Sequence, residues 1–446
     1  MSAAQGTPQN GTPGLLATRA WAIPLAVAWA VAFAAGSVGF AQRLTEGHQP
    51  ADYGSFMTWG LWVAVYQYLI EMAAGAFIIT AAIFVLRLKP LERLARVSLL
   101  LALVSLIAGI FMVWIDLGRM ERFWRVIATP DWSSVIAWVV VAYTAFLILG
   151  AAALWFAMRR DLVERSRGAG SLAAVARVLT FGRTDLSEAA LRRDMQVVRV
   201  LMILGLVPAI GFSGGEGALF GVVGARPYWN SSILPIAFLA SSLVTAGAAL
   251  TVFGAFFWPE RSLRQRDMVI FMGRLTMISL AALLLLEFAA YSVGMYASIP
   301  AQRDAYAEIL YGDYWWSFWL VHLLGGAAIP FVLLAIRGKS PNWLGIAAFL
   351  VAAGMMSVRL NAVIPGQILP QLEGLDTAFV SDRLAFDYAP SAMEWLVSLF
   401  VASITVLLFY VGYRLLPIGG QAIEATPGPG TSQPEAAPAA RFEGGD

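Results

Sequence analysis

The chain has 446 residues, of which 59% are hydrophobic and only 13% are charged. Soluble globular chains are about 45–50% apolar and about 25% charged, so this composition excludes a soluble protein and indicates an integral membrane protein. The sequence has no cysteine and only two histidines, His48 and His322. It therefore lacks the ligands for an iron–sulfur cluster of its own or for a haem held by paired histidines.

Ten apolar stretches are long enough to cross a membrane, because a helix needs about 20 apolar residues to span the hydrocarbon core. We predict an all-α, polytopic transmembrane helix bundle with spans at 21–41, 57–86, 93–114, 133–157, 197–222, 232–258, 268–297, 314–336, 342–363 and 391–416. The first stretch is long for a signal peptide and no cleavage site follows it, so we expect it to be retained as the first helix.

The basic residues are divided unequally between the two sides of this bundle. Twenty Lys and Arg residues fall on one side and eight on the other. The positive-inside rule places the richer side, which includes nine arginines between Arg159 and Arg199, in the cytoplasm. Both termini are then cytoplasmic: a segment at 1–20, a transmembrane domain at 21–416, and a tail at 417–446 whose composition predicts disorder.

The tryptophans are also distributed unequally, but most of them lie on the side that has fewer basic residues. Eleven of the 16 tryptophans lie at or near the predicted outer face. A belt that only anchors the protein in lipid normally appears on both faces. A one-sided belt favours a partner or a ligand on the outer face over the plain belt.

Ionisable side chains within spans are expensive to bury, and we single out Glu71, Glu216, Arg274, Glu287 and His322. Interhelical hydrogen bonds or an internal ion pair, such as Arg274 with a glutamate, explain any one of them as well as a function does. The set as a whole favours function.

Two spans combine such groups with features that suit a flat ligand. Gln67, Glu71 and Gly75 share one helix face, and the small residues there permit close approach of a ring or a helix. His322 follows Phe318 and Trp319 on one side of its helix, an arrangement that suits a quinone head group. A lone histidine among aromatic residues is also often a packing residue.

The glycine-rich run 211–217 around Glu216 predicts either a helix break beside a cavity or close helix packing. It does not have the form of a phosphate-binding loop. No metal-binding motif and no nucleophile–base pair is present, so hydrolytic chemistry has no support.

The most specific motifs lie in the predicted outer loops. They are Asp116-Leu117-Gly118-Arg119 with the aromatic residues after it, the run from Leu61 to Gly75 before it, Ala225 to Ser231, and the closing Pro390-Ser391-x-x-Glu394. In this order and on one face, they resemble the NrfD-like family of polysulfide reductase membrane subunits (PsrC), and the ten spans resemble its longer, HybB-like branch. Glu71 departs from the uncharged residue expected there.

The resemblance implies a haem-free subunit that reacts with a quinone, menaquinone or ubiquinone, in a bacterial inner membrane. Such subunits dock a ferredoxin-like iron–sulfur subunit on the outer face, often joined to a molybdopterin or other redox enzyme. The resemblance also implies two related four-helix units with flanking helices, which a weak echo between residues 73–75 and 245–247 supports. Terminal substrate and direction of electron flow stay open.

We assign expected roles on this basis. The predicted catalytic residues are Asp116, His322 and Glu71. The predicted quinone contacts are Tyr66, Gln67, Arg119, Tyr143 and Trp319, and the predicted proton pathway is Glu216, Arg274 and Glu287. The predicted docking residues are Arg122, Arg125, Arg226, Trp124, Trp132 and Trp229.

We expect no metal and no nucleic acid, and we expect lipid as the other partner. The alternative is a secondary transporter or ion-translocating subunit with buried carboxylates. A transporter would not need arginines and tryptophans gathered on the outer surface.

Overall fold

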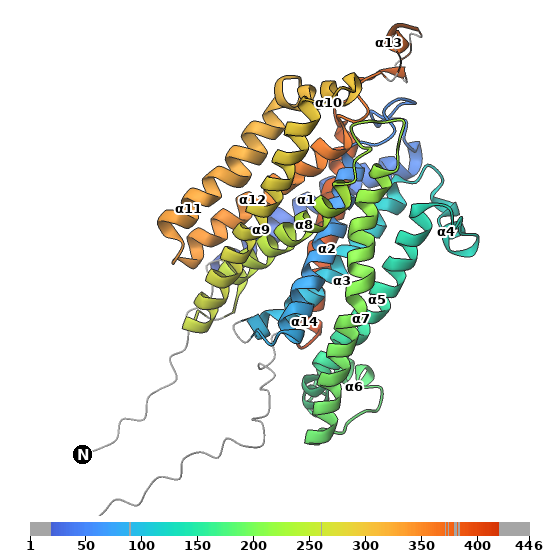
Figure 1. Ribbon diagram of the computed structural model, residues 1–446. Coiled ribbons are helices and arrows are strands. Elements are labelled where there is room, and N and C mark those ends of the chain that lie inside the picture. Colours follow the sequence, from blue (N-terminus) through green and yellow to red (C-terminus); the bar gives the residue numbers. More distant parts are fainter. Residues whose placement is uncertain are drawn as a thin grey trace, which may run out of the picture.

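The computed structural model describes residues 19–88, 91–259, 261–370, 372, 374–378, 381 and 384–418. Throughout these residues the fold is helical, and ten helices are long and apolar enough to cross a membrane (Figure 1). The predicted fold class is confirmed, and the protein is a multi-pass membrane protein. The segment at 1–20 and the tail at 417–446 lie almost wholly outside the described residues, so their expected location and disorder stay predictions.

The spanning helices match the predicted spans at most boundaries. They are α1 (Arg19–Glu46), α2 (Leu61–Val85), α3 (Glu92–Asp116), α5 (Val135–Ser166), α7 (Glu188–Gly221), α8 (Leu234–Val252) with η4 (Phe253–Phe257), α9 (Leu263–Met295), η5 (Ser317–Ala328) with α11 (Ile329–Arg337), α12 (Pro341–Val363) and α14 (Ala392–Leu415). Helices α5 and α7 are longer than predicted at one end, because each continues as a polar helix beyond its apolar span.

Short helices mark the two ends of the bundle. Helices η3 (Met120–Arg122), α4 (Arg125–Ala128), α10 (Pro300–Tyr311) and α13 (Leu375–Ala378) lie at the end where α3 finishes, which we call the Asp116 face (Figure 1). Helix α6 (Ser171–Leu179) lies at the opposite end, between α5 and α7, which we call the arginine-rich face.

The spanning helices form two groups of four. Helices α2, α3, α5 and α7 pack in a ring, in which α2 contacts α3 and α7 while α5 contacts α3 and α7. Helices α8, α9, η5–α11 and α12 form the second group, joined to the first by contacts of α2 with α8 and α12. Helices α1 and α14 pair with each other beside α3. The helix contacts thus divide eight spans into two groups of four, and that the two groups are related to each other stays a prediction.

Glycine permits the closest helix crossings. A methyl group on Gly75 of α2 would lie 1.9 Å from the carbonyl oxygen of Ser242 in α8. Gly326 of η5 and Gly354 of α12 meet in the same way, since a methyl group on Gly354 would lie 2.6 Å from Cα of Gly326. Small residues at such crossings let helix backbones approach closely inside a membrane.

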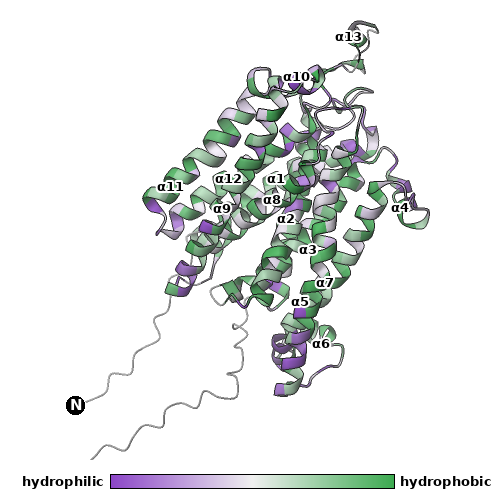
Figure 2. Cartoon of the chain, viewed as in Figure 1, coloured by the Kyte–Doolittle hydropathy of each residue, from purple (hydrophilic) through white to green (hydrophobic). Residues whose placement is uncertain are grey.

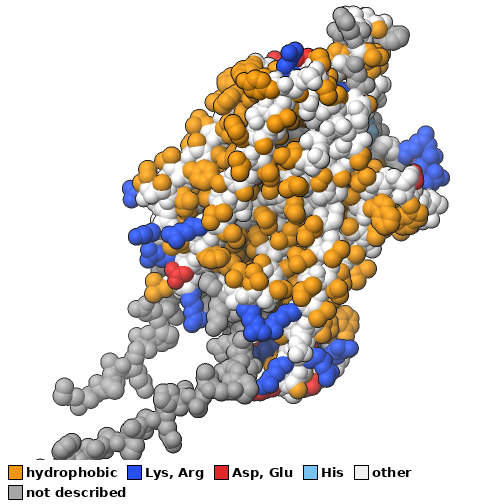
Figure 3. Space-filling model, viewed as in Figure 1, with side chains coloured by type: hydrophobic (Ala, Val, Ile, Leu, Met, Phe, Trp, Pro, Cys, Tyr) orange, Lys and Arg blue, Asp and Glu red, His pale blue; other side chains and the backbone are white. Residues whose placement is uncertain are grey.

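The flank of the bundle is apolar. Helix α1 exposes Ile23, Val27, Val31 and Val38, and hydrophobic residues cover the helices along their middle (Figure 2). Lys and Arg side chains gather at the two ends (Figure 3). This distribution is that of a protein whose middle contacts lipid.

Candidate functional site

The three predicted catalytic residues lie in three separate pairs of ionisable side chains rather than in one pocket. Glu71, Asp116 and His322 each contact a different partner. Helix α3, which ends at Asp116, packs against α2, α5 and α14, whereas η5, which carries His322, packs against α10, α11 and α12. The structure therefore does not bring the three predicted catalytic residues together, and we describe each pair separately.

The first pair lies in the middle of the bundle and joins the two four-helix groups. Arg359 Nη1 of α12 lies 3.0 Å from Glu71 Oε1 of α2, and Arg359 Nη2 donates to Ser241 Oγ of α8 at 2.9 Å. The guanidinium also lies 4.0 Å from the centre of the Phe238 ring. Both side chains are buried, Arg359 to 2% exposure and Glu71 completely. The ion pair, the hydroxyl and the aromatic face together compensate a charge that lipid would otherwise exclude.

A second carboxylate lies close to this pair. Tyr143 of α5 donates from its hydroxyl to Glu216 Oε1 of α7 at 2.7 Å, and Glu216 is within electrostatic range of both Glu71 and Arg359. The side-chain atoms Glu71 Oε2, Glu216 Oε2, Gln67 Oε1 and Arg359 Nε are buried with no hydrogen-bond partner in the described part of the sequence. Buried polar atoms are normally paired, so these atoms mark where a polar molecule can bond.

The third carboxylate, Asp116, lies at the end of α3 and is reached from outside. His48 Nε2 lies 4.0 Å from Asp116 Oδ1, and the two side chains are 26% and 18% exposed. The Tyr53 and Trp62 rings lie 5.8 and 5.6 Å from the imidazole, centre to centre. Arg43 of α1 donates to the carbonyl oxygens of Ile115 and Leu117, at 3.0 and 2.8 Å, and so fixes the helix end that carries Asp116. We call this arrangement the His48–Asp116 mouth.

The loops around this mouth are tied to the helices below. The Tyr388 hydroxyl accepts from the Leu61 backbone N–H at 2.7 Å and donates to the Glu394 carboxylate, which also accepts from the Asp52 N–H at 3.0 Å. Burial and the nearby Glu394 carboxylate raise the pKa of Tyr388, so the phenol stays a donor. Burial, and then Asp116, likewise raise the pKa of Tyr53 well above its ordinary value.

The predicted Pro-Ser-x-x-Glu motif thus has a structural role as well. Ser391 and Glu394 form a capping box at the start of α14, with each side chain bonded to the backbone of the other residue. This reciprocal bonding satisfies two N–H groups at the helix end. It also sets Glu394 under the loop that carries Asp52 and His48.

His322 pairs with Glu287 of α9. His322 Nε2 and Glu287 Oε2 lie 2.7 Å apart, and the Phe318 ring centre lies 6.0 Å from the imidazole. His322 sits in η5, a π-helix of 12 residues. Such helices are rare and frequently occur at functional sites. Trp319, a predicted quinone contact, instead points outward, is 43% exposed and donates from Nε1 to the Leu310 carbonyl at 2.9 Å.

The remaining predicted contacts of the site are distributed over the first four-helix group. Tyr66 is half-buried and lies within electrostatic range of both Asp116 and Glu216, between the mouth and the buried carboxylates. Arg119 is exposed, and Asp116 pairs with His48 rather than with it. Arg274 is exposed on α9, so the suggested ion pair of Arg274 with a glutamate is wrong, because Arg359 takes that place.

Most predicted docking residues are exposed. Arg122, Trp124, Arg125 and Trp132 lie on the segment around η3 and α4, where the Arg125 guanidinium lies 5.8 Å from the Trp124 ring centre. Trp229 is a correction, since it is 4% exposed and its Nε1 donates to the Ala362 carbonyl at 2.8 Å. Its indole is used inside the protein and is not available to a partner.

Arg226 is partly committed to the fold as well. Its Nη1 donates to the carbonyl oxygens of Gln367 and Leu369, at 3.3 and 3.4 Å. Burial lowers the pKa of this half-buried guanidinium. Arg226 therefore holds a loop on the Asp116 face, and a docking role would be additional to this one.

Sequence reasoning misses two residues of the site. Arg359 is one of the eight basic residues that the charge count places on the outer side, although it lies inside the predicted span 342–363, and its position in that span is the signal that could have found it. His48 lies in a polar loop. No local pattern shows that this loop returns over α2 to Asp116.

The comparisons with known proteins agree with this architecture. The family model "Polysulphide reductase, NrfD" matches residues 49–371. A selenate reductase subunit of Mesobacillus selenatarsenatis is 33% identical over 90% of this chain and 95% of the relative. A polysulfide reductase chain of Wolinella succinogenes is 25% identical over 70% and 95%, and the Hdr-like menaquinol oxidoreductase integral membrane subunit of Archaeoglobus fulgidus is 22% identical over 81% and 85%. The protein belongs to the polysulphide reductase NrfD family, as its motifs predicted.

Proposed function

We propose that this protein is the quinone-reactive membrane subunit of an oxidoreductase complex. It passes electrons between a quinone in the membrane and an iron–sulfur subunit docked on the Asp116 face, which in turn connects to a molybdopterin or other redox enzyme. The relatives' names support this reading, since each is a subunit of a reductase or of a menaquinol oxidoreductase. The quinone is menaquinone or ubiquinone.

The observation that carries the proposal is the His48–Asp116 mouth. An imidazole and a carboxylate lie side by side, partly exposed, and the half-buried Tyr53 ring and the buried Trp62 ring pack beside the imidazole. Aromatic walls with a few placed polar groups are typical of sites for flat organic cofactors. The donor set therefore fits a quinone head group, which would rest against the half-buried ring of Tyr53, while the buried Trp62 ring supports the imidazole from inside.

A bound quinol supplies two electrons and two hydroxyl protons. The protein must accept those protons, and the neutral His48 imidazole is suited to this because histidine changes charge near neutral pH. Asp116 then stabilises the imidazolium across the 4.0 Å that separates the two groups. Tyr66, Glu216 and Glu71 lie further inward and provide places for protons to move away from the mouth.

His322 and Glu287 form a separate acid–base pair in the second four-helix group. We assign them to the predicted proton pathway, without Arg274, whose guanidinium stays protonated and is exposed on α9 away from this pair. Buried carboxylates with unpaired atoms, Glu71 and Glu216, favour ion translocation as the second candidate function. Movement of protons through the bundle would accompany electron transfer rather than replace it.

The partner surface in this proposal is the exposed segment around η3 and α4. Arginine and tryptophan are enriched at interface cores, where removal of one side chain typically costs more than about 1 kcal/mol. Charge reversal at Arg122 and Arg125 is expected to release the iron–sulfur subunit during purification without unfolding the bundle. Arg303→Glu is the matched control, since Arg303 is exposed on the same face but outside the η3–α4 segment, and it pairs with its neighbour Asp304 as Arg122 does with Glu121. If the iron–sulfur subunit stays bound after charge reversal at Arg122 and Arg125, the result would contradict the docking assignment and favour a transporter.

In this proposal the Asp116 face lies outside a bacterial cytoplasmic membrane, and both termini lie on the cytoplasmic side. The concentration of arginines at the opposite end supports it through the positive-inside rule.

Variants of the mouth test the proposal. Asp116→Asn and His48→Gln are expected to lower oxidation of a quinol analogue by the purified complex about 100-fold, the lower range for loss of a general acid or base. His322→Ala is expected to act only on the proton pathway and to lower turnover less. Asp131→Asn is the control, because Asp131 is an exposed carboxylate of the same face whose side chain bonds to the neighbouring Ser133. Full turnover in both mouth variants would place the site elsewhere.

A further inference from the structure

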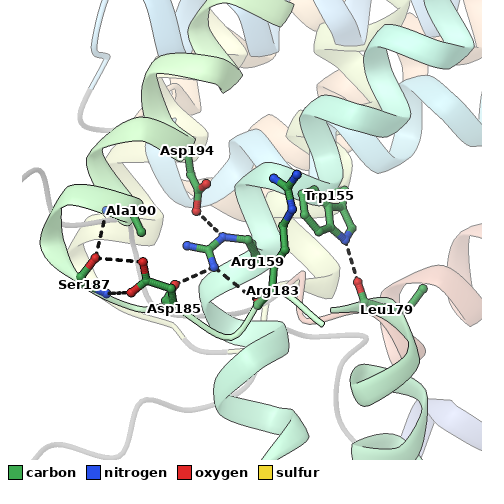
Figure 4. A network of polar contacts seen from close by, with 8 residues as sticks. All are labelled: Trp155, Arg159, Leu179, Arg183, Asp185, Ser187, Ala190 and Asp194. Carbon is green, nitrogen blue, oxygen red and sulfur yellow. Dashed lines mark hydrogen bonds and ion pairs between the residues drawn. The ribbon is translucent and has the colours of Figure 1, made fainter. Parts of the chain in front are cut away.

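The arginine-rich face carries a feature that electron transfer does not use. Helix α6 folds back along α5, and its last residue meets the tryptophan where α5 leaves the membrane. The Trp155 indole donates from Nε1 to the Leu179 carbonyl at 2.7 Å (Figure 4). The Arg183 guanidinium and the Phe181 ring both lie near the same indole, at 6.0 and 5.9 Å between centres. Residues 177–183, the α6 turn, are thus fixed at the level of Trp155.

That level can be assigned relative to the membrane. Helix α5 starts at Val135 on the Asp116 face and rises about 1.5 Å per residue. About 20 residues cross the hydrocarbon core, so a count from Val135 reaches the opposite boundary near Trp155. Tryptophan is the residue typical of this boundary. The α6 turn therefore lies at the depth of the lipid head groups.

The turn presents both apolar and basic side chains at this depth. Val178 and Phe181 are each 72% exposed, and Arg177 and Arg183 beside them are exposed as well. Phe181 has a φ of +48°, in the left-handed region that a bulky residue rarely occupies. Such strain persists only where the surroundings enforce it, so the outward position of the ring is maintained at a cost.

Polar contacts of α5 with α7 and with the segment between α6 and α7 fix the chain that follows Phe181. Arg159 of α5 pairs with Asp194 of α7 at 2.5 Å and donates to the Asp185 carbonyl at 2.6 Å, while Asp185 accepts from the Ser187 N–H at 2.8 Å (Figure 4). The acidic side chains nearest the turn are therefore already engaged, and Asp161 pairs with Arg96. Arg177 and Arg183 have no carboxylate within ion-pair distance among the described residues.

We propose that the α6 turn is a binding site for anionic phospholipid on the arginine-rich face. Val178 and Phe181 enter the boundary between head groups and acyl chains, and Arg177 and Arg183 bind the lipid phosphate. An amphipathic segment held at interface depth with cations beside apolar residues matches the chemistry of an anionic lipid surface. The inference does not depend on the proposed function, since no residue of the quinone site takes part.

The first test measures depth. The sequence has no cysteine, so Phe181→Cys provides a single site for a nitroxide label on the full-length protein in phosphatidylcholine–phosphatidylglycerol liposomes. We expect the label to be accessible to oxygen and shielded from a water-soluble nickel complex. Leu172→Cys is the control, because Leu172 is exposed at the other end of α6, further from Trp155, and its label should be accessible to nickel. Equal access of nickel to both labels would overturn the proposal.

The second test measures lipid selectivity. We expect the Arg177→Gln/Arg183→Gln protein to retain several-fold less phosphatidylglycerol than the parent after detergent purification, with phosphatidylcholine unchanged, as counted by native mass spectrometry. Arg192→Gln is the matched control, since Arg192 is exposed on the same face and pairs with Glu188. Unaltered phosphatidylglycerol retention in the double variant would overturn the lipid site. Quinol oxidation should be the same in the double variant and in the parent, whether or not lipid retention changes. The result therefore tests the lipid site independently of the proposed function.

Discussion

Two arginines of this molecule, Arg159 and Arg359, are buried to a similar extent but have different roles. Arg159 at the arginine-rich face and Arg359 in the middle of the bundle each pair with a carboxylate and are 4% and 2% exposed. The partner of Arg159, Asp194, is 14% exposed and the contacts continue to backbone carbonyls near water. The partner of Arg359 is completely buried, keeps an unpaired oxygen and has a second carboxylate nearby.

This difference separates an ion pair with a structural role, Arg159–Asp194, from one that stability alone does not explain, Glu71–Arg359. A pair near water loses little hydration and closes a loop, so Arg159 is explained by structure alone. A pair inside lipid-facing helices gives up several kcal/mol of hydration per ion, and apolar residues of the same size would often serve stability as well. Each arginine keeps a buried nitrogen without a hydrogen-bond partner among the described residues, Nη2 in Arg159 and Nε in Arg359. What distinguishes the Glu71–Arg359 pair is the unpaired Glu71 oxygen and the nearby Glu216 carboxylate, and these argue that the pair is retained for chemistry.

The largest expected effect comes from Arg359→Gln. It leaves Glu71 buried without its cation, which costs about 3–5 kcal/mol when one partner of a buried pair is removed. Thermal unfolding of the purified protein in detergent measures the loss. The Glu71→Gln/Arg359→Gln double variant should recover most of it, because no uncompensated charge is left. A double variant as unstable as the single one would show that Arg359 stabilises through packing on Phe238 instead.

A smaller effect is expected from Arg159→Gln. It removes the charged contacts with Asp194 and with the 183–185 loop, but these partner groups lie near water and can be rehydrated, so we expect a net loss of about 1.5–3 kcal/mol. We expect faster hydrogen exchange confined to residues 180–194 and unchanged quinol oxidation. Arg192→Ala sets the lower limit, since its exposed pair with Glu188 on one helix is worth about 0.3–0.5 kcal/mol. Loss of turnover in Arg159→Gln would remove the distinction between the two arginines.

Most of the fold was predictable because lipid imposes a length and a composition on each span. Most of the helices begin or end within a few residues of the predicted boundaries, and only α5 and α7 extend well beyond them, where polar residues continue the helix into water. The π-helical geometry of η5 was not predictable. This helix packs closely against α12 at Gly326 and Gly354, a contact between distant segments that no single stretch of sequence records.

The site was predictable only in part. Glu71, Glu216, Glu287 and His322 stand out because a charge in an apolar span is costly, and the structure pairs each of them. Their partners did not stand out. Arg359 reaches Glu71 across more than half of the sequence, and His48 reaches Asp116 through a loop, so both pairings depend on how helices pack. Trp229 was misjudged for the same reason, since outer-face location does not reveal burial.

Photolabelling with an azidoquinone tests the central claim most directly. The probe is added to the purified complex in lipid, irradiated, and its attachment points are mapped by mass spectrometry, with excess menaquinone as competitor. We predict competitor-sensitive labelling at the His48–Asp116 mouth, in residues 43–62 and 114–117, and its loss in Asp116→Asn. Labelling confined to η5 around His322, or labelling that menaquinone does not displace, would contradict the account.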